Sequence, residues 1–282
     1  MENVIKKAVL LVAGLGTRFL PLSKVLSKEL WPLLNQPIVD YIIDEIKGSG
    51  IKEIIFVVSP ENKILRNYFK RNRKVEEILK ERGKKEFLRD FQKHQRSFQG
   101  LSLSFVYQKK PLGLGHAILQ AKSKLGKDPF IVCFNDDVIV SSTPCSSQLI
   151  KVFEKYGKTV IAIKRVPKDR VGFYGSLKVK KVAPRLYQIK GIIEKPRPGE
   201  AYSNLVTDGR YLLTTDVFDY LGKPESFFQG EIILANTLEQ MIKAGIIVYG
   251  YEFEGKWLEC GNVQTWLKSN LYLAKREFKN FK

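Results

Sequence analysis

The first half of the chain alternates short apolar runs with longer segments whose apolar residues recur at helical spacing. Apolar runs of strand length stand at 8–12, 54–58 and 130–134. They are apolar almost throughout, which is typical of strands covered on both faces. Residues 38–46 and 114–125 instead repeat apolar positions every three or four residues, which predicts helices. Strands joined through helices imply crossover connections, so we predict a mostly parallel sheet.

Two other segments of the first half have different patterns. Residues 101–107 alternate apolar and polar positions, as expected of a half-buried strand. Residues 61–97 are highly charged and carry widely spaced apolar positions, which predicts helices that run over the surface.

The second half changes to apolar runs separated by short turns, which favours antiparallel pairing. Strands are predicted at 159–163, 172–182, 187–193 and 246–253, and helices at 231–244 and 263–278. No linker rich in Pro, Gly or Ser divides the chain. We therefore predict one Rossmann-like α/β domain over residues 1–282, with a mostly parallel central sheet and an antiparallel extension. Its two halves are about 5–140 and about 141–282.

Composition excludes several classes of protein. The 282 residues are 44% hydrophobic and 27% charged, which is ordinary for a globular chain. No apolar run of about 18 residues is present, which excludes a transmembrane helix. The three cysteines form no CxxC pair, which excludes a disulfide framework and a structural zinc finger. The first apolar run ends at glycines rather than at a cleavage site, so we expect no signal peptide and a cytoplasmic protein.

The net charge of +19 is unusual, and it is concentrated in three segments. Residues 62–97, 164–197 and 268–282 contribute +8, +9 and +4. Basic segments on an otherwise balanced chain attract polyanions such as nucleotides, sugar phosphates or nucleic acid. The chain has no recognisable nucleic-acid-binding motif, so we do not expect a nucleic-acid partner.

A glycine loop follows the first predicted strand directly. It reads Ala-Gly-Leu-Gly-Thr-Arg over residues 13–18, and small residues there let backbone N–H groups approach a phosphate. Neither the Rossmann glycine spacing nor that of a P-loop is present. Arg18 and Lys28 are two cations able to straddle a polyphosphate, one as a planar fork and one as a point charge.

This loop resembles the signature of the sugar-1-phosphate nucleotidylyltransferases, in particular the branch of bacterial UTP–glucose-1-phosphate uridylyltransferases. Residues 13–21 read Ala-Gly-Leu-Gly-Thr-Arg-Phe-Leu-Pro, and Lys28-Glu29 follows. Further matches come in the same order as in the family, over about residues 5–270. They are Gln108 with 111–117, Asp136-Asp137, Tyr174-Gly175, 194–196, 203–205, 209–211, 230–232, 253–256, and Glu259-x-Gly261.

The resemblance implies transfer of UMP from UTP to glucose 1-phosphate, by in-line attack on the α-phosphorus with release of pyrophosphate. The attacking phosphate oxygen is already anionic near neutral pH, so positioning and charge neutralisation replace a general base. Arg18 and Lys28 would neutralise the triphosphate, and Lys195 would bind the sugar phosphate. Neither His94 nor His116 is given a catalytic role.

The resemblance also assigns the nucleotide to the first half and the sugar to the second. The implied nucleotide-binding residues are Ala13, Gly14, Gly16, Gln108 and Gly113. The Gln108 amide offers both a donor and an acceptor to the edge of uracil. Glu194 and the Gly175 backbone would bind glucose. Glu194 and Lys195 point to opposite faces unless the strand breaks there, and Pro196 favours such a break.

A magnesium site is implied by the acidic residues. Asp136 matches the metal ligand of the family, and Asp137 is an accessory. Glu259 stands where related enzymes have a second aspartate, and its longer side chain is still able to reach a metal. Mg²⁺ prefers one or two carboxylates, with phosphate oxygens and water completing its octahedron.

Several residues depart from the family pattern. Ser27 replaces a proline before Lys28, Asp208 replaces an apolar residue, and the stretch 233–236 has Ile233, Ala235 and Asn236 in place of three polar residues. These departures leave two alternatives open. One is a nucleotidylyltransferase acting with dTTP or on another hexose 1-phosphate, and the other is a catalytically impaired regulatory paralogue.

Related enzymes form homodimers or tetramers, so the resemblance implies a homo-oligomer. The terminal helix predicted at 263–278 has apolar residues that suit a subunit contact. We assign Val263, Trp266, Leu267 and Leu271 instead to the intramolecular core.

Overall fold

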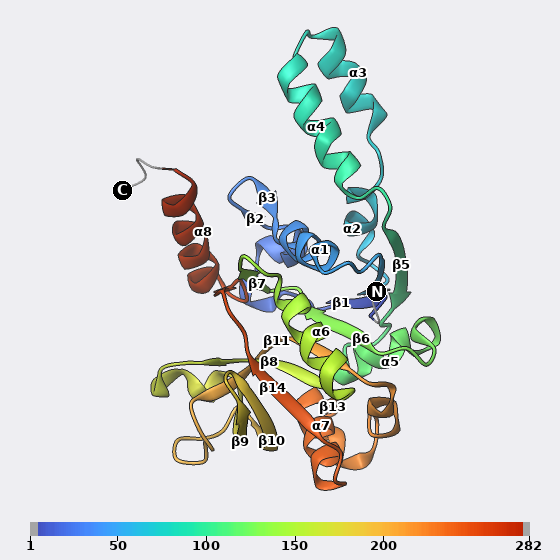
Figure 1. The fold of residues 1–282 in the computed structure, drawn as a ribbon. Coiled ribbons are helices and arrows are strands. Elements are labelled where there is room, and N and C mark those ends of the chain that lie inside the picture. The colour runs from blue at the N-terminus through green and yellow to red at the C-terminus, as the bar shows by residue number, and fades with distance from the viewer. Residues whose placement is uncertain (1–4, 279–282) are drawn as a thin grey trace.

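The computed structural model describes residues 5–278, and its centre is a nine-stranded sheet (Figure 1). The strand order is β5-β4-β1-β6-β11-β8-β14-β10-β9. In chain order the nine strands are β1 Lys7–Val12, β4 Glu53–Val58, β5 Ser102–Tyr107, β6 Phe130–Phe134, β8 Val160–Arg165, β9 Gly175–Ala183, β10 Leu186–Glu194, β11 Leu205–Leu213 and β14 Val248–Glu252.

The parallel part and the antiparallel extension are both as predicted. β1 pairs in parallel with β4 and β6, and β4 with β5. β9, β10 and β14 form the extension through antiparallel pairs, and β14 joins β8 in parallel. β11 is antiparallel to both of its neighbours, β6 and β8, and so joins the two parts into one sheet.

Eight helices accompany this sheet within residues 5–278. They are α1 Ile38–Gly48, α2 Lys63–Tyr68, α3 Arg73–Glu81, α4 Lys85–Ser97, α5 Gly113–Leu125, α6 Cys145–Tyr156, α7 Leu234–Lys243 and α8 Val263–Glu277. Alternate residues of β1 lie in two different apolar clusters. The cluster on one face contains α1 and α6, and the cluster on the other contains α5 and α7. The sheet is therefore covered on both faces, which explains its continuous apolar runs.

Two predicted boundaries are wrong. The strand predicted from residue 172 begins at Gly175, because Lys168–Phe173 forms a 3₁₀ helix. The helix predicted from residue 231 begins at Leu234, because β13 (Glu231–Ile232) pairs with β12 (Phe227–Phe228). Two other short pairs join β2 (Pro32–Leu33) to β3 (Gln36–Pro37) and β7 (Asp137–Val140) to β15 (Lys256–Glu259).

β11 is the main element that the sequence pattern did not predict. All nine of its residues are buried, although Asp208 and Arg210 are charged. Arg210 is fully buried and pairs with Glu45 of α1, with Nη2 2.9 Å from Oε2. The sequence pattern does not reveal this buried strand, because the partner that compensates the charge of Arg210 lies 165 residues earlier in the chain.

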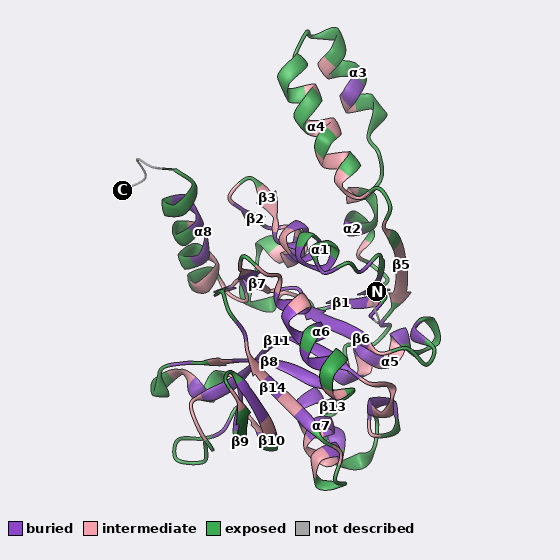
Figure 2. Cartoon of the chain, viewed as in Figure 1, coloured by how far each residue is buried: buried purple, intermediate pink, exposed green. Residues whose placement is uncertain are grey.

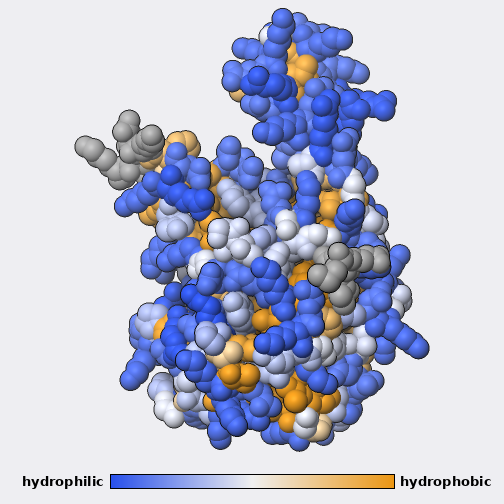
Figure 3. Space-filling model, viewed as in Figure 1, coloured by the Kyte–Doolittle hydropathy of each residue, from blue (hydrophilic) through white to orange (hydrophobic). Residues whose placement is uncertain are grey.

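The charged segment 61–97 forms surface helices, as predicted. α3 and α4 pack side by side in an arm that projects from the body (Figure 1). Most of the arm is exposed (Figure 2), and its visible surface is largely hydrophilic (Figure 3). Glu76 of α3 accepts hydrogen bonds from Gln92 and Gln95 of α4 and so links the two helices.

The base of the arm is tied to the body by a histidine. His94 Nε2 lies 2.8 Å from Asp40 Oδ2 of α1, and the Tyr68 hydroxyl donates to the same oxygen. The hydrogen bond to Asp40 raises the pKa of His94. His94 is therefore a structural residue of the arm, as its position in the charged segment suggested.

The assignment of the α8 residues to the core is mostly wrong. Val263, Leu267 and Leu271 are 48%, 49% and 42% exposed. Trp266 alone of the four packs inward, with its ring edge against Trp31 and its Nε1 donating to the Pro32 carbonyl. Within residues 5–278 no helix is both long and apolar enough to cross a membrane.

Candidate active site

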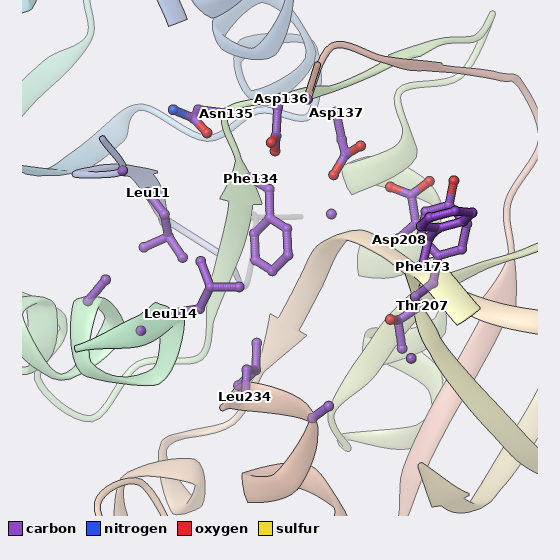
Figure 4. Close-up of a pocket in the computed structure, with 18 of the residues that line it drawn as sticks. Leu11, Leu114, Phe134, Asn135, Asp136, Asp137, Phe173, Thr207, Asp208 and Leu234 are labelled. Carbon is purple, nitrogen blue, oxygen red and sulfur yellow. The ribbon is translucent and has the colours of Figure 1, made fainter. Parts of the chain in front are cut away.

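A cavity of about 570 Å³ lies between the parallel half of the sheet and the antiparallel extension (Figure 4). Its lining comes from the glycine loop after β1, the acidic turn after β6, the ends of β10 and β11, and the β15 region. Every residue predicted for the site lines this cavity except Gly16. The structure thus brings together side chains that are nearly 250 positions apart in the sequence.

Gly16 belongs to the turn that shapes the loop rather than to the cavity wall. Its φ is 62°, a value that favours glycine, and a Cβ there would lie 3.1 Å from Cβ of Ser23. Gly14 does line the cavity, where the stem of Lys28 passes 4.0 Å from the position of its absent Cβ. The left-handed backbone explains why position 16 is a glycine, and its contact with substrate stays a prediction.

Ser27, which stands where the family pattern has proline, keeps a backbone conformation that proline also adopts. Ser27 has φ −63° and ψ 144°, within the range that proline imposes. The 3₁₀ helix Lys28–Leu30 follows directly, and the Lys28 side chain is only 13% exposed. The buried Glu29 carboxylate anchors this segment, because it accepts hydrogen bonds from the side-chain amides of Asn62 and Asn135.

The two predicted cations meet at Asp136. Lys28 Nζ lies 2.8 Å from Asp136 Oδ2, and an Arg18 Nη2 lies 3.8 Å from the same atom. Burial alone would raise the pKa of Asp136, but the ammonium of Lys28 and then the guanidinium of Arg18 lower it below its usual value. Asp136 is therefore an anion held by cations that a polyphosphate would also attract.

Asp137 lies on the other side of the same turn. Its Oδ1 accepts a hydrogen bond of 2.7 Å from Trp257 Nε1. Burial and the charge of Asp136 raise its pKa to about 7. The turn itself is held by Arg210, whose Nη2 donates to the Asp137 carbonyl at 2.8 Å.

Glu259 lines the cavity but is already engaged. Its Oε2 lies 2.7 Å from Arg170 Nη2, and its Oε1 accepts from the Tyr174 hydroxyl. Arg170 lies in the 3₁₀ helix Lys168–Phe173, which precedes β9. Tyr174 is the residue that caps the end of this helix. Both carboxylate oxygens of Glu259 are thus engaged by the segment that precedes β9. Sequence reasoning missed this pairing because Arg170 stands 89 positions away.

Glu194 and Lys195 both line the cavity, although neighbouring residues of an unbroken strand would point to opposite faces. β10 ends at Glu194, and Lys195 has a left-handed φ of 45°. Gly175 faces Glu194 across the β9–β10 pair, where a Cβ would lie 2.9 Å from Thr207 Oγ1 and 3.3 Å from Glu194 Oε2. Burial raises the pKa of Glu194, and the nearby Lys195 partly offsets this. A side chain at position 175 would fill the space beside Thr207 and Glu194, so only glycine keeps this part of the cavity open.

Gln108 and Gly113 are joined on the opposite wall. Gln108 Nε2 donates to the Gly113 carbonyl at 3.0 Å and lies 3.0 Å from His116 Nδ1. Gly113 has φ 89°, and a Cβ there would lie 2.7 Å from the Ile232 carbonyl. Burial lowers the pKa of His116, which favours a neutral ring that orients Gln108. This supports a positioning rather than a catalytic role for His116.

Asp208 is the cavity residue with the least obvious role. It is 2% exposed, and neither carboxylate oxygen has a hydrogen-bond donor in bonding geometry within residues 5–278. Burial and the neighbouring Asp137 raise its pKa well above the usual value, although Arg210 and the Gly209 amide act in the opposite direction. Its departure from the family pattern was noted from the sequence, but its burial required the structure.

A glycine loop ending in Arg18, the nearby Lys28 and an acidic turn that both cations approach line one cavity of an α/β sheet. This arrangement is typical of a transferase that handles phosphate groups. The sequence profile of the family described as "Nucleotidyl transferase" matches residues 7–276, and the chain belongs to this family. Enzymes of the family generally use a divalent metal.

The curated relatives carry a more particular name. UTP–glucose-1-phosphate uridylyltransferase of Staphylococcus haemolyticus (strain JCSC1435) is 37% identical over 97% of this chain and 93% of that protein. The enzyme named UTP–glucose-1-phosphate uridylyltransferase 2 of Staphylococcus saprophyticus matches with the same identity and coverage.

Solved structures agree with this relationship. A UDP-glucose pyrophosphorylase complexed with UDP-glucose superposes with a TM-score of 0.85 at 30% identity, covering 97% of this chain and 100% of the other. A UTP-bound UGPase from Acinetobacter baumannii has a TM-score of 0.88 at 34% identity, covering 98% and 95%. The predicted fold class is thereby confirmed.

Proposed function

We propose that this chain is a UTP–glucose-1-phosphate uridylyltransferase. The observation that carries the proposal is the arrangement of Arg18, Lys28 and Asp136 on one wall of a cavity whose opposite side holds Glu194 and Lys195. The names of its relatives give the same substrates, and structures similar to it hold UTP or UDP-glucose. Residues of about 5–140 bind the nucleotide, and residues of about 141–282 bind the sugar phosphate.

In the proposed reaction, a phosphate oxygen of glucose 1-phosphate attacks the α-phosphorus of UTP. One P–O bond forms, the bond to the bridging oxygen of the β-phosphate breaks, and pyrophosphate leaves with the bonding electrons. No proton has to be removed from the nucleophile, so the residues act by orientation and charge. Arg18 and Lys28 neutralise the triphosphate and the leaving pyrophosphate, and Lys195 holds the attacking phosphate.

The remaining contacts determine which substrates fit. Gln108, held by Gly113, presents its amide to the uracil edge, and the backbone of Ala13 and Gly14 lies beside the base. Glu194 accepts hydrogen bonds from glucose hydroxyls next to the Gly175 backbone. Ile233 and Ala235 line the cavity where related sequences are polar, so they add apolar contact and no hydrogen bond.

The acidic turn suits a divalent cation, for which we propose Mg²⁺ with Asp136 as a ligand. Carboxylate oxygens are the donors that Mg²⁺ prefers, and buried Asp208 leaves two of them without a partner. Residues 5–278 contain no cluster of three or more His, Cys, Asp or Glu that encloses a metal by itself. This fits an ion that takes its other ligands from phosphate and water. When bound, it would supply charge neutralisation at the phosphates.

Pyrophosphate release tests the proposal. The purified protein is mixed with Mg²⁺, glucose 1-phosphate and one of UTP, dTTP, ATP, CTP or GTP. We expect release with UTP, and we expect Lys28→Met to reduce kcat/KM by about 100-fold or more, as loss of a charge-stabilising donor does. Lys24→Met is the matched control, because Lys24 is exposed and outside the cavity. Release with dTTP in preference to UTP would overturn the nucleotide assignment, and no release from folded protein that binds UDP-glucose would favour a regulatory paralogue.

We also propose that the enzyme is a homo-oligomer whose subunits meet through α8. The exposed Val263, Leu267 and Leu271 support this, because they place apolar side chains on the surface of one helix. Light scattering would show a mass above 32.3 kDa that falls toward it in Leu267→Lys/Leu271→Lys. A wild-type protein that is monomeric at micromolar concentration would contradict the proposal.

A further inference from the structure

Asp208 is buried in a way that disfavours its charge. A carboxylate that is 2% exposed, and whose oxygens accept no hydrogen bond of normal geometry within residues 5–278, is expensive to keep ionised. Buried acidic groups are normally paired or bound to a metal. The nearest strong cation on its own strand, Arg210, points instead to Glu45. Asp208 therefore forms no ion pair within the described residues.

The backbone of β11 aims this group into the cavity. The pairing of β11 with β8 is irregular between Thr207 and Tyr211, so the usual alternation of side chains is broken there. Thr207, Asp208 and Gly209 all line the cavity. An irregularity of this kind often redirects a side chain toward a functional site.

The carboxylate of Asp208 lies beside that of Asp137. A Cβ on Gly209 would lie 2.3 Å from Asp137 Oδ2, so the absence of a side chain at Gly209 is what admits Asp137 to this position. Figure 4 shows the carboxylates of Asp136, Asp137 and Asp208 in a row along one side of the cavity. Two acidic groups packed this closely repel each other unless positive charge lies between them.

The other carboxylates are partly or fully engaged. Asp136 Oδ2 is held by Lys28, and Asp137 Oδ1 by Trp257. Both oxygens of Glu259 accept hydrogen bonds, from Arg170 and Tyr174. Asp208 is therefore better placed than Glu259 to supply a second carboxylate.

We propose that Asp208 is a ligand of the divalent cation, which binds between Asp208 and Asp137 beside Asp136. Glu259 then holds Arg170 and Tyr174 on the sugar side and does not contact the metal. This inference rests on the proposed function for the use made of the metal. Without substrate, water would complete the shell of an ion held by the carboxylates of Asp208 and Asp137, so binding is measurable with the metal alone.

Binding of Mn²⁺ alone to the full chain tests the proposal, with free Mn²⁺ followed by electron paramagnetic resonance. We expect Asp208→Asn to weaken Mn²⁺ binding by about tenfold or more, as loss of a ligand contact does. Glu259→Gln is the matched variant, since it removes the same charge from the same cavity, and it should leave Mn²⁺ affinity unchanged. Asp90→Asn, on the exposed arm, is a remote control.

Thermal unfolding separates a ligand from a structural residue. In EDTA, Asp208→Asn and Asp208→Val should unfold at higher temperature than the wild type, because each removes an unpartnered buried carboxylate. Mn²⁺ should raise the melting temperature of the wild type more than that of either variant. A structural role for Asp208 predicts the opposite order in EDTA.

Four results would overturn the proposal. They are no Mn²⁺ binding by the wild type, unchanged affinity in Asp208→Asn, loss of affinity in Glu259→Gln alone, and variants that are less stable than the wild type in EDTA. The pyrophosphate assay keeps the two proposals distinct. A protein that binds Mn²⁺ through Asp208 but releases no pyrophosphate contradicts the proposed function only, whereas an active protein with unchanged affinity in Asp208→Asn contradicts this inference only.

Discussion

Replacing Arg210 with methionine removes the cation that holds α1, β11 and the acidic turn together. The guanidinium donates to both oxygens of Glu45 at 2.9–3.1 Å, and to the carbonyls of Gly209 and Asp137 at 3.1 and 2.8 Å. Methionine has a similar apolar stem but no donors. The Glu45 side chain, 4% exposed, would then be a buried charge whose remaining donors come from Ser146.

The magnitude follows from this burial. Removing one partner of a buried ion pair costs about 3–5 kcal/mol, because the other charge stays uncompensated. For a chain of 282 residues that corresponds to a fall in melting temperature of roughly 5–8 °C, because unfolding entropy is about 2.1 cal/mol/K per residue. The double variant Glu45→Met/Arg210→Met should recover part of this loss, since it leaves no buried charge.

The assay is thermal unfolding of the two single variants and the double variant, with kcat and KM measured well below the melting temperature. We expect kcat to fall in Arg210→Met, because the Asp137 carbonyl loses its donor and the acidic turn is no longer fixed. Either a melting temperature within about 2 °C of the wild type for Arg210→Met, or a double variant less stable than both single variants, would refute the reasoning.

Three other predictions concern single positions. Gly113→Ala should raise the KM for UTP, because its Cβ would lie 2.7 Å from the Ile232 carbonyl; an unchanged KM would contradict this. Gly175→Ala should raise the KM for glucose 1-phosphate and leave that for UTP unchanged, and equal rises would show a general loss of structure instead. His94→Ala should destabilise the protein more at pH 5.5 than at pH 8.5. The pKa of His94 is raised in the folded state, so its stabilisation is present below the unfolded pKa of about 6.5 and is lost as pH rises through the folded pKa. A loss of stability that does not vary with pH would exclude this.

Local patterns predicted the parts of the site whose residues are neighbours in sequence. The loop after β1 and the acidic turn after β6 follow apolar strands, and parallel pairing of those strands brings both to one edge of the sheet. Pro196 marked a boundary after Glu194, but the left-handed φ of 45° at Lys195 is not the extended conformation that a following proline favours. These features depend on periodicity and on backbone sterics that act over a few residues.

The features that were missed depend on partners far away in the chain. β11 was not predicted as a strand, because the burial of its charged Arg210 depends on Glu45 of α1. The pairing of Glu259 with Arg170 was not predicted, because nothing near Glu259 in the sequence indicates it. The role of Glu259 as a metal ligand stays a prediction. The oddity of Asp208 was visible, but its isolation from donors is a property of the packed interior. The sequence pattern predicts the type of most elements, but it does not determine which side chains pair across the fold.

The central place of β11 has a consequence for how the protein is made. β11 fills the gap between β6 and β8, so the sheet stays open until residues 205–213 have been synthesised. Glu45 emerges 165 residues before Arg210. At a synthesis rate of about 5–20 residues per second, Arg210 is added to the chain roughly 8–33 seconds after Glu45. In that interval Glu45 lacks the cation that compensates for its burial, so the face of α1 that carries it cannot reach its final packing.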